Sequence, residues 1–134
     1  MHLIADIYGY FSSAPASSYM PVTPFRRLDT RKSAGAALPG GDAYLVAMDQ
    51  GLGRLDPNAV LTGIVVNSTV TQTTASGYLT VFPDNSDDGQ QTAVVPNTST
   101  LNFTANNTVA NLGFPRSRAT TPSTSTTAAA AACN

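Results

Sequence analysis

The chain contains no tryptophan and no glutamate, and it has one histidine, one cysteine and one lysine. Only 11% of its residues are charged, so its polar surface must consist mainly of threonine, serine, asparagine and glutamine. Because glutamate and lysine are common surface residues of helices, their scarcity disfavours helical structure. The formal net charge of −1 offers no basic surface for nucleic acid, so we expect no nucleic-acid partner.

Long apolar runs are also missing. None approaches the roughly 20 residues that a membrane-spanning helix requires, so we expect no membrane insertion. The first residues lack the basic stretch, apolar stretch and cleavage site of a secretory signal. If the protein is exported, its signal therefore lies outside this chain.

Residues for catalysis are scarce. His2 has no second histidine with which to form a metal site, and Cys133 lies at the opposite end of the sequence. We therefore expect no catalytic residue, no cofactor and no enzymatic activity. Three carboxylates at Asp84, Asp87 and Asp88 are weak calcium candidates. We favour a solvated turn there, because the spacing, the glycine and the final glutamate of a helix–loop–helix calcium site are missing.

Short stretches rich in β-branched and aromatic residues recur along the chain, separated by turn signals. They predict strands at Leu3–Tyr10, Met20–Leu28, Ala43–Met48, Val60–Val70, Gly77–Phe82, Thr92–Val95, Thr100–Thr104 and Val109–Leu112. Such spacing is typical of an all-β, antiparallel β-sandwich, here expected to be jelly-roll-like. The predicted core residues are Leu3, Ile4, Ile7, Val46, Ile64, Val66, Leu79, Val81, Leu101 and Phe103. The one helix candidate is Met48–Leu55, where two glycines favour a loop or a single 3₁₀ turn.

A chain of 134 residues accommodates one domain, which we place at residues 1–113. Residues 114–134 are rich in threonine, serine, proline and alanine. Such a composition buries too little apolar surface to offset chain entropy. We therefore predict a low-complexity, disordered tail, which is either a stalk or the product of a shifted reading frame.

The segment FRRLDTR at residues 25–31, which we call the clasp segment, concentrates charge in a chain that has little. Asp29 can accept hydrogen bonds from the backbone N–H groups that follow it and can pair with Arg27 or Arg31. The arginines could instead bind a carboxylate or an anionic wall polymer. We favour a structural clasp of Arg27, Asp29 and Arg31 that holds the end of a strand.

Several phrases resemble a secreted, β-rich repeat unit of high-GC Gram-positive bacteria, found in tandem or beside cell-wall hydrolases. They are HLIADIYGYF at 2–11, RLDTR at 27–31, GYLTVFP at 77–83, STLNFT at 99–104 and TVANL at 108–112. The resemblance implies a secreted or cell-surface protein that acts as a non-catalytic structural or spacer module.

In that family the phrase ending in GYF closes a unit, whereas here it opens the chain. The first strand is therefore expected to come from a preceding unit. It either fills the place of the unit's own last strand or leaves an open sheet edge through which chains could self-associate.

The alternative function is a carbohydrate- or cell-wall-binding, adhesive module. Tyr8 and Tyr10 are the residues that would contact its ligand. Sugar-binding faces usually use tryptophan, which this chain lacks, so the structural module is the preferred interpretation. The expected partners are cell-wall polysaccharide or sister repeat units.

Overall fold

The structure, a computed structural model, describes residues 1–12, 19–32, 37–48, 52, 61–83, 95–115 and 127–133. The side chains of residues 10–12 and 127–133 lie outside that description. The described residues form strands and no helix, which confirms the all-β prediction. The strands are β1 (His2–Ser12), β2 (Met20–Asp29), β3 (Ala43–Ala47), β4 (Leu61–Thr71), β5 (Gly77–Pro83), β6 (Leu101–Phe103), β7 (Val109–Gly113) and β8 (Thr127–Cys133).

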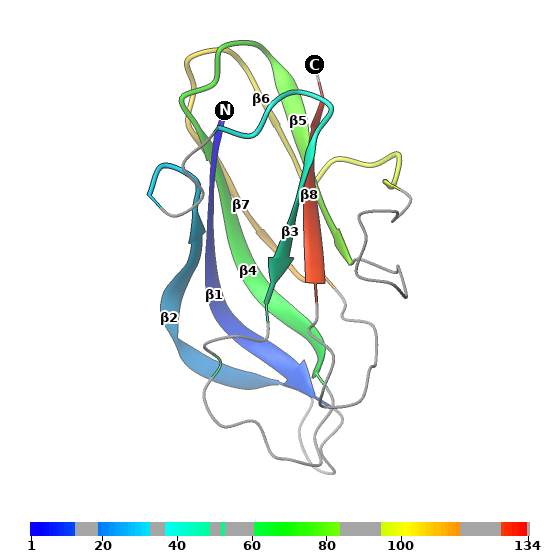
Figure 1. Cartoon of the computed structure of the whole chain (residues 1–134). Helices are drawn as coiled ribbons and strands as arrows, with labels where there is room; N and C mark the ends of the chain where they lie inside the picture. Colours follow the sequence, from blue (N-terminus) through cyan, green and yellow to red (C-terminus); the bar gives the residue numbers. More distant parts are fainter. Residues whose placement is uncertain are drawn as a thin grey trace.

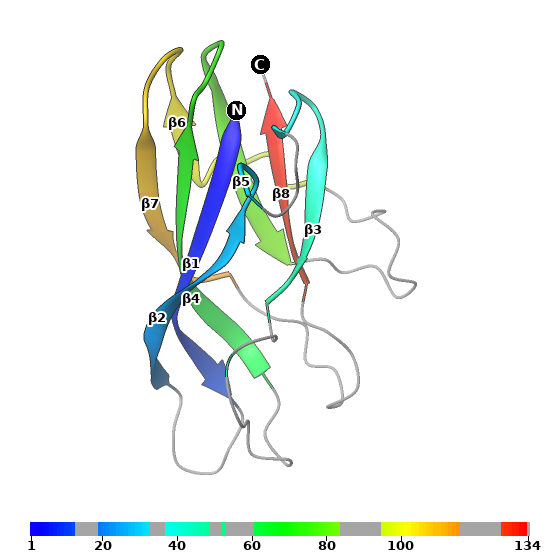
Figure 2. The ribbon, with the colours of Figure 1, turned by 60° about the vertical axis from the view of Figure 1, so that its left-hand side comes forward.

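These strands form two antiparallel sheets that lie against each other in two layers (Figures 1 and 2). The strand order is β2-β1-β4-β7 in the first sheet and β3-β8-β5-β6 in the second. Buried side chains from both sheets pack together between the layers. This arrangement is compatible with the predicted β-sandwich, and its jelly-roll variant stays a prediction.

The first strand is internal to its sheet. It pairs with β2 from Ile4↔Asp29 to Tyr10↔Met20, and with β4 along its whole length. Both ladders slip between Ile7 and Gly9. The ring of Tyr19 lies over Gly9, where a Cβ atom would come within 2.5 Å of the Tyr19 Oη. A side chain at this position would therefore displace the Tyr19 ring.

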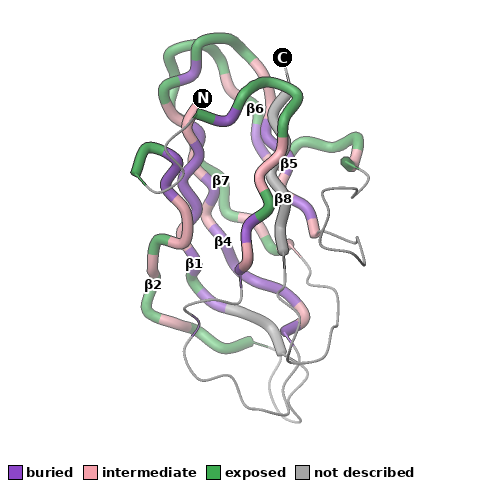
Figure 3. The backbone as a smooth tube through the Cα atoms, viewed as in Figure 1, coloured by how far each residue is buried: buried purple, intermediate pink, exposed green. Residues whose placement is uncertain are grey.

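The core follows from the alternation of side chains along each strand. In β4, Ile64, Val66 and Val70 are buried toward the second sheet, whereas Asn67 and Thr69 are half-buried on the outer face. Figure 3 shows buried positions concentrated on β1, β4 and β5, while β2 consists almost entirely of exposed and half-buried positions. Every predicted core residue is buried except Val81 and Phe103, which are half-buried and pack against the core.

Two buried clusters make up this core. One lies around Ile7 and Val66, and the other around Leu3 and Leu79. Leu28, Tyr44 and Val81 pack against both clusters. The apolar interior is therefore continuous along the domain.

Two predicted elements differ from the structure or lie partly outside it. In the strand predicted at Thr92–Val95, residues 92–94 are outside the described residues, and Val95 is exposed and not in a strand. In the helix candidate Met48–Leu55, Met48 and Leu52 are described, and both are buried without helical geometry. No helix in the described residues has the length and hydropathy of a membrane span.

The clearest difference concerns the predicted disordered tail, because residues 127–133 form β8. This strand pairs with β3 from Ala43↔Ala131 to Ala47↔Thr127 and with β5 from Tyr78↔Cys133 to Pro83↔Ala128. The prediction considered only the apolar surface that side chains bury. A strand between two others also gains backbone hydrogen bonds on both sides, which need no large side chain.

Candidate functional site

The clasp segment contains a β-bulge that decides where its charges point. Asp6 and Ile4 lie two residues apart in β1, but their partners Arg26 and Asp29 lie three apart in β2. Arg27 is the extra residue of this bulge. Because paired residues point to the same face of a sheet, Arg26 and Asp29 share the outer face with Asp6.

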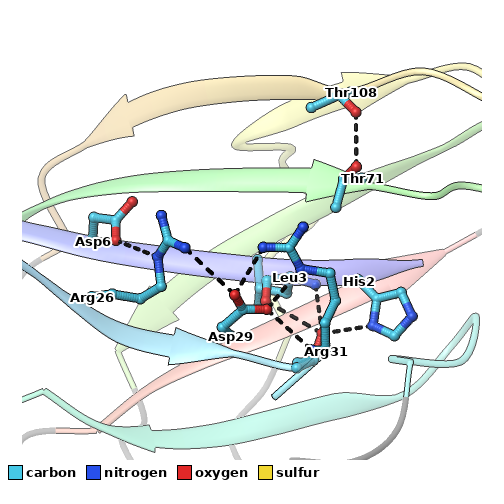
Figure 4. Close-up of polar contacts among 9 residues, drawn as sticks. His2, Leu3, Asp6, Arg26, Asp29, Arg31, Thr71 and Thr108 are labelled. Carbon is cyan, nitrogen blue, oxygen red and sulfur yellow. Dashed lines mark hydrogen bonds and ion pairs between the residues drawn. The ribbon is translucent and has the colours of Figure 1, made fainter. Parts of the chain in front are cut away.

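On this face, the Arg31 guanidinium donates two hydrogen bonds to the Asp29 carboxylate, from Nε to Oδ1 at 2.9 Å and from Nη2 to Oδ2 at 2.8 Å (Figure 4). The Arg31 backbone N–H also donates to Oδ1 at 3.1 Å, as in an Asx turn. The side chain of Asp29 is only 4% exposed. Hydrogen bonding from the Arg31 guanidinium holds the pKa of the Asp29 carboxyl well below its ordinary value, even though burial opposes the shift.

Arg26 extends this arrangement to β1. Its Nε donates to Asp6 Oδ1 at 2.9 Å, and its Nη1 lies 3.5 Å from Asp29 Oδ2 (Figure 4). The hydrogen bond to Asp6 raises the pKa of Arg26. The sequence predicted Arg27 or Arg31 as the partner of Asp29. The structure confirms Arg31, and it places Arg26 rather than Arg27 near the same carboxylate.

Arg27 points elsewhere. Its Nε donates to the backbone carbonyl of Ala47 in β3, at 2.6 Å. This bond connects the edge strand of the first sheet with the edge strand of the second. The predicted clasp of Arg27, Asp29 and Arg31 is therefore divided: Arg31 and Asp29 close the end of β2, and Arg27 ties the two sheets together.

Thr30 is a structural residue of the clasp segment that the sequence analysis gave no role. It is fully buried, and its Oγ1 accepts from the Leu3 backbone N–H at 2.9 Å. Its own N–H donates to the Leu3 carbonyl at 3.0 Å, and His2 Nδ1 lies 3.2 Å from Oγ1. These contacts continue the β1–β2 pairing by one residue beyond the last ladder pair.

The tyrosines proposed as ligand contacts have different outcomes. Tyr8 is 39% exposed on β1. Tyr10 lies on the same strand, but its side chain is outside the described part of the chain. The exposed ring of Tyr19 covers Gly9, and Tyr44 packs against the core. Of the two proposed ligand contacts, the structure therefore describes the side chain of Tyr8 alone.

The weak calcium candidates Asp84, Asp87 and Asp88 lie outside the described residues. Within the described ranges, no group of three or more histidine, cysteine, aspartate or glutamate side chains could hold a metal ion.

A cleft that the sequence did not indicate lies between the edges of the two sheets. It has a volume of about 340 Å³. Its described lining comes from β4, β5, β7 and the segments beside β6 and β7: Val66, Ser68, Val81, Ser99, Thr100, Asn111, Leu112, Gly113, Phe114 and Pro115. Figure 2 shows β6 and β7 next to each other at this side of the domain. No local pattern predicts the cleft, because its residues meet only when the sheets pack.

Comparisons of the chain with protein-family models, with curated proteins and with solved structures gave no match.

Proposed function

We propose that this chain is a non-catalytic structural module of the cell surface that spaces or displays neighbouring domains. The observation that carries the proposal is the use of the clasp segment. Its charged groups bind the domain itself: Arg31 binds Asp29, Arg26 binds Asp6, and Arg27 binds the Ala47 carbonyl. These contacts strengthen the fold, and they engage the side chains that an anion-binding site would need.

The cell-surface location rests on the resemblance of the GYF, RLDTR and TVANL phrases to secreted bacterial repeat units. Sister repeat units are partners that suit this proposal, since the described sheets end in the edge strands β2, β7, β3 and β6. An edge strand can pair with a strand of another chain.

The second candidate is a wall-binding module that uses Tyr8. Its support is the exposure of that ring, since exposed aromatic side chains offer a flat apolar face and, in tyrosine, a hydroxyl.

A structural role and a wall-binding role of the clasp segment can be distinguished with the variant Arg31→Ala. The two measurements are the midpoint of thermal unfolding and the fraction of protein retained on purified peptidoglycan sacculi. If the segment is structural, Arg31→Ala lowers the midpoint of thermal unfolding, and the folded variant is retained on sacculi as wild type is. The neighbouring exposed cation Lys32 provides the control Lys32→Ala, which should change neither measurement. Release of soluble sugar from the sacculi should stay at the level without protein.

The proposal fails if Arg31→Ala loses retention while its unfolding midpoint stays unchanged, because the arginine would then bind the wall. Loss of retention in Tyr8→Ala alone would support the second candidate instead.

A further inference from the structure

Ser68 presents a buried hydroxyl to the cleft between the sheets. It lies in β4, between Val66 and Val70 on the face that points to the second sheet, and it is 2% exposed. No described group forms a hydrogen bond with its Oγ, although its neighbours in the ladder, Ala5 and Asn111, pair with its backbone. A buried hydroxyl without a partner is unfavourable, and a molecule bound in the cleft, whether water or a ligand, would satisfy it.

Two other polar side chains of the cleft, Thr100 and Asn111, can form hydrogen bonds with a ligand, one as a donor and one as an acceptor. Thr100 Oγ1 accepts a hydrogen bond from the Val81 backbone N–H at 2.8 Å, which leaves its O–H as a donor. Asn111 Nδ2 donates to the Thr100 carbonyl at 2.7 Å, and this bond fixes the amide with Oδ1 as a free acceptor. The cleft therefore offers both donors and acceptors.

The rest of the lining defines the class of ligand. No described lining residue is charged, so an ionic ligand would find no counter-charge. Val66 and Val81 provide apolar wall, and Phe114, 62% exposed, stands at the cleft with Pro115. The volume of about 340 Å³ is far more than one water requires and lies at the small end of known ligand pockets.

We propose that this cleft binds a neutral saccharide unit. The hydroxyls of the sugar would pair with Ser68 Oγ, Thr100 Oγ1 and Asn111 Oδ1, and its C–H face would pack on Phe114. A sugar suits this site because it combines many neutral donors and acceptors with an apolar ring face. The site is separate from Tyr8 and from the clasp segment, and it adds a ligand to the structural role.

The test is a titration of the ¹⁵N-labelled chain with chitotriose, cellotriose and maltotriose at millimolar concentrations, followed by amide chemical shifts. We expect at least one of the three to shift the amides of Ser68, Thr100 and Asn111 in a saturable way. Ser68→Ala should weaken binding by a few-fold to about tenfold, the contribution of one neutral hydrogen bond. The matched control is Thr69→Ala, next along β4 and on the outer face, which should bind as wild type does.

Stability separates binding from structure at Ser68. A structural hydroxyl would make Ser68→Ala less stable than wild type, whereas an unpartnered one leaves the unfolding midpoint unchanged or raises it. A second variant, Gly113→Val, adds a side chain to the lining of the cleft and so reduces its volume. The Cβ atom at this position meets only ordinary contacts at 3.8 Å or more. It should abolish binding, and Ala110→Val on the exposed face of β7 should not.

Three outcomes would overturn the proposal. The first is that no trisaccharide shifts the lining amides, so that the cleft holds water only. In the second, the shifts depend on protein concentration without sugar, which would make the cleft an interface between copies of this chain. The third is that Ser68→Ala and Gly113→Val bind as tightly as wild type.

Discussion

Asp29 is the residue on which the clasp segment depends. Its carboxylate accepts two side-chain hydrogen bonds and one backbone hydrogen bond from Arg31, and it lies 3.5 Å from the Arg26 guanidinium. Each of these interactions requires or favours the ionised form, which lowers the pKa of the carboxyl group. The stability of the domain is therefore coupled to the ionisation of this one group.

Asp29→Asn should lower the midpoint of thermal unfolding at pH 7. Because the folded-state pKa lies below the ordinary value of 3.8, the contribution of Asp29 is complete above that value and is lost as pH falls toward the folded-state pKa. The difference between wild type and variant should thus begin to narrow below about pH 4. Asp42→Asn, at an exposed carboxylate, is the control and should show little difference at any pH. A difference that stays constant down to pH 2 would contradict this account.

Thr30→Val should destabilise the domain although the two side chains have nearly the same shape. Valine cannot accept from the buried Leu3 N–H, and an unsatisfied buried donor costs about 1–3 kcal/mol. Chemical denaturation measures this loss as a lower midpoint with an unchanged slope. Thr69→Val, half-buried on the outer face of β4, should stay close to wild type. Equal stabilities of the two variants would show that the Thr30 hydroxyl is dispensable.

At the scale of elements, the second sheet depends on the strand of simplest sequence. β3 and β5 do not pair with each other, and β8 lies between them (Figure 1). Its alanines suit this position because the backbone provides the hydrogen bonds and the neighbouring strands provide the large side chains. Val46, Leu79 and Phe82, for example, are buried on β3 and β5. The order of this sheet should therefore respond to changes in β8 more strongly than the order of the first sheet.

Ala129→Pro tests this dependence. Ala129 pairs with Leu45 on one side and Phe82 on the other, and proline removes its N–H from the ladder. We expect a loss of about 1–3 kcal/mol for the unpaired carbonyl, with faster amide exchange in β3 than in β1 or β4. Ala129→Val keeps the N–H and should leave the exchange of β3 unchanged. Unaltered exchange in the proline variant would mean that β8 does not hold β3.

At the scale of the whole molecule, the two buried clusters should behave as one core. Leu28, Tyr44 and Val81 touch both clusters, and Arg27 links the edges of the two sheets. Neither cluster can be exposed without disturbing these shared contacts. The domain should therefore unfold in a single cooperative transition, as small domains generally do.

Leu79→Ala and Val66→Ala test this in one cluster each. Leu79→Ala should cost about 2–5 kcal/mol and Val66→Ala somewhat less, because fewer methyl groups are removed from a closely packed interior. Calorimetry should show one transition in both variants, shifted to lower temperature. Leu45→Ala, at a leucine that is 36% exposed, should cost much less. Two separate transitions in either variant would contradict a continuous core.

Much of the fold was predictable from local pattern. Alternation and β-branched composition located the strands β1 to β7, and most of the predicted core residues, from Leu3 to Leu101, are buried. The charged phrase at residues 25–31 also identified Asp29 and Arg31 as partners before any geometry was known. These features are local, since the period of a strand and the reach of an Asx turn depend on neighbouring residues alone.

Tertiary structure decided the rest. The bulge at Arg27 directs Arg26, and not Arg27, toward Asp29, and it follows from pairing with β1, at least 20 residues away. An alanine-rich segment forms β8 because β3 and β5, which are distant in sequence, both pair with it. Its own sequence contains no local pattern that predicts a strand. The cleft beside Ser68 likewise exists only after both sheets have packed. By itself the sequence determined which residues prefer strands and the core, whereas long-range pairing determined where backbone and polar groups find their partners.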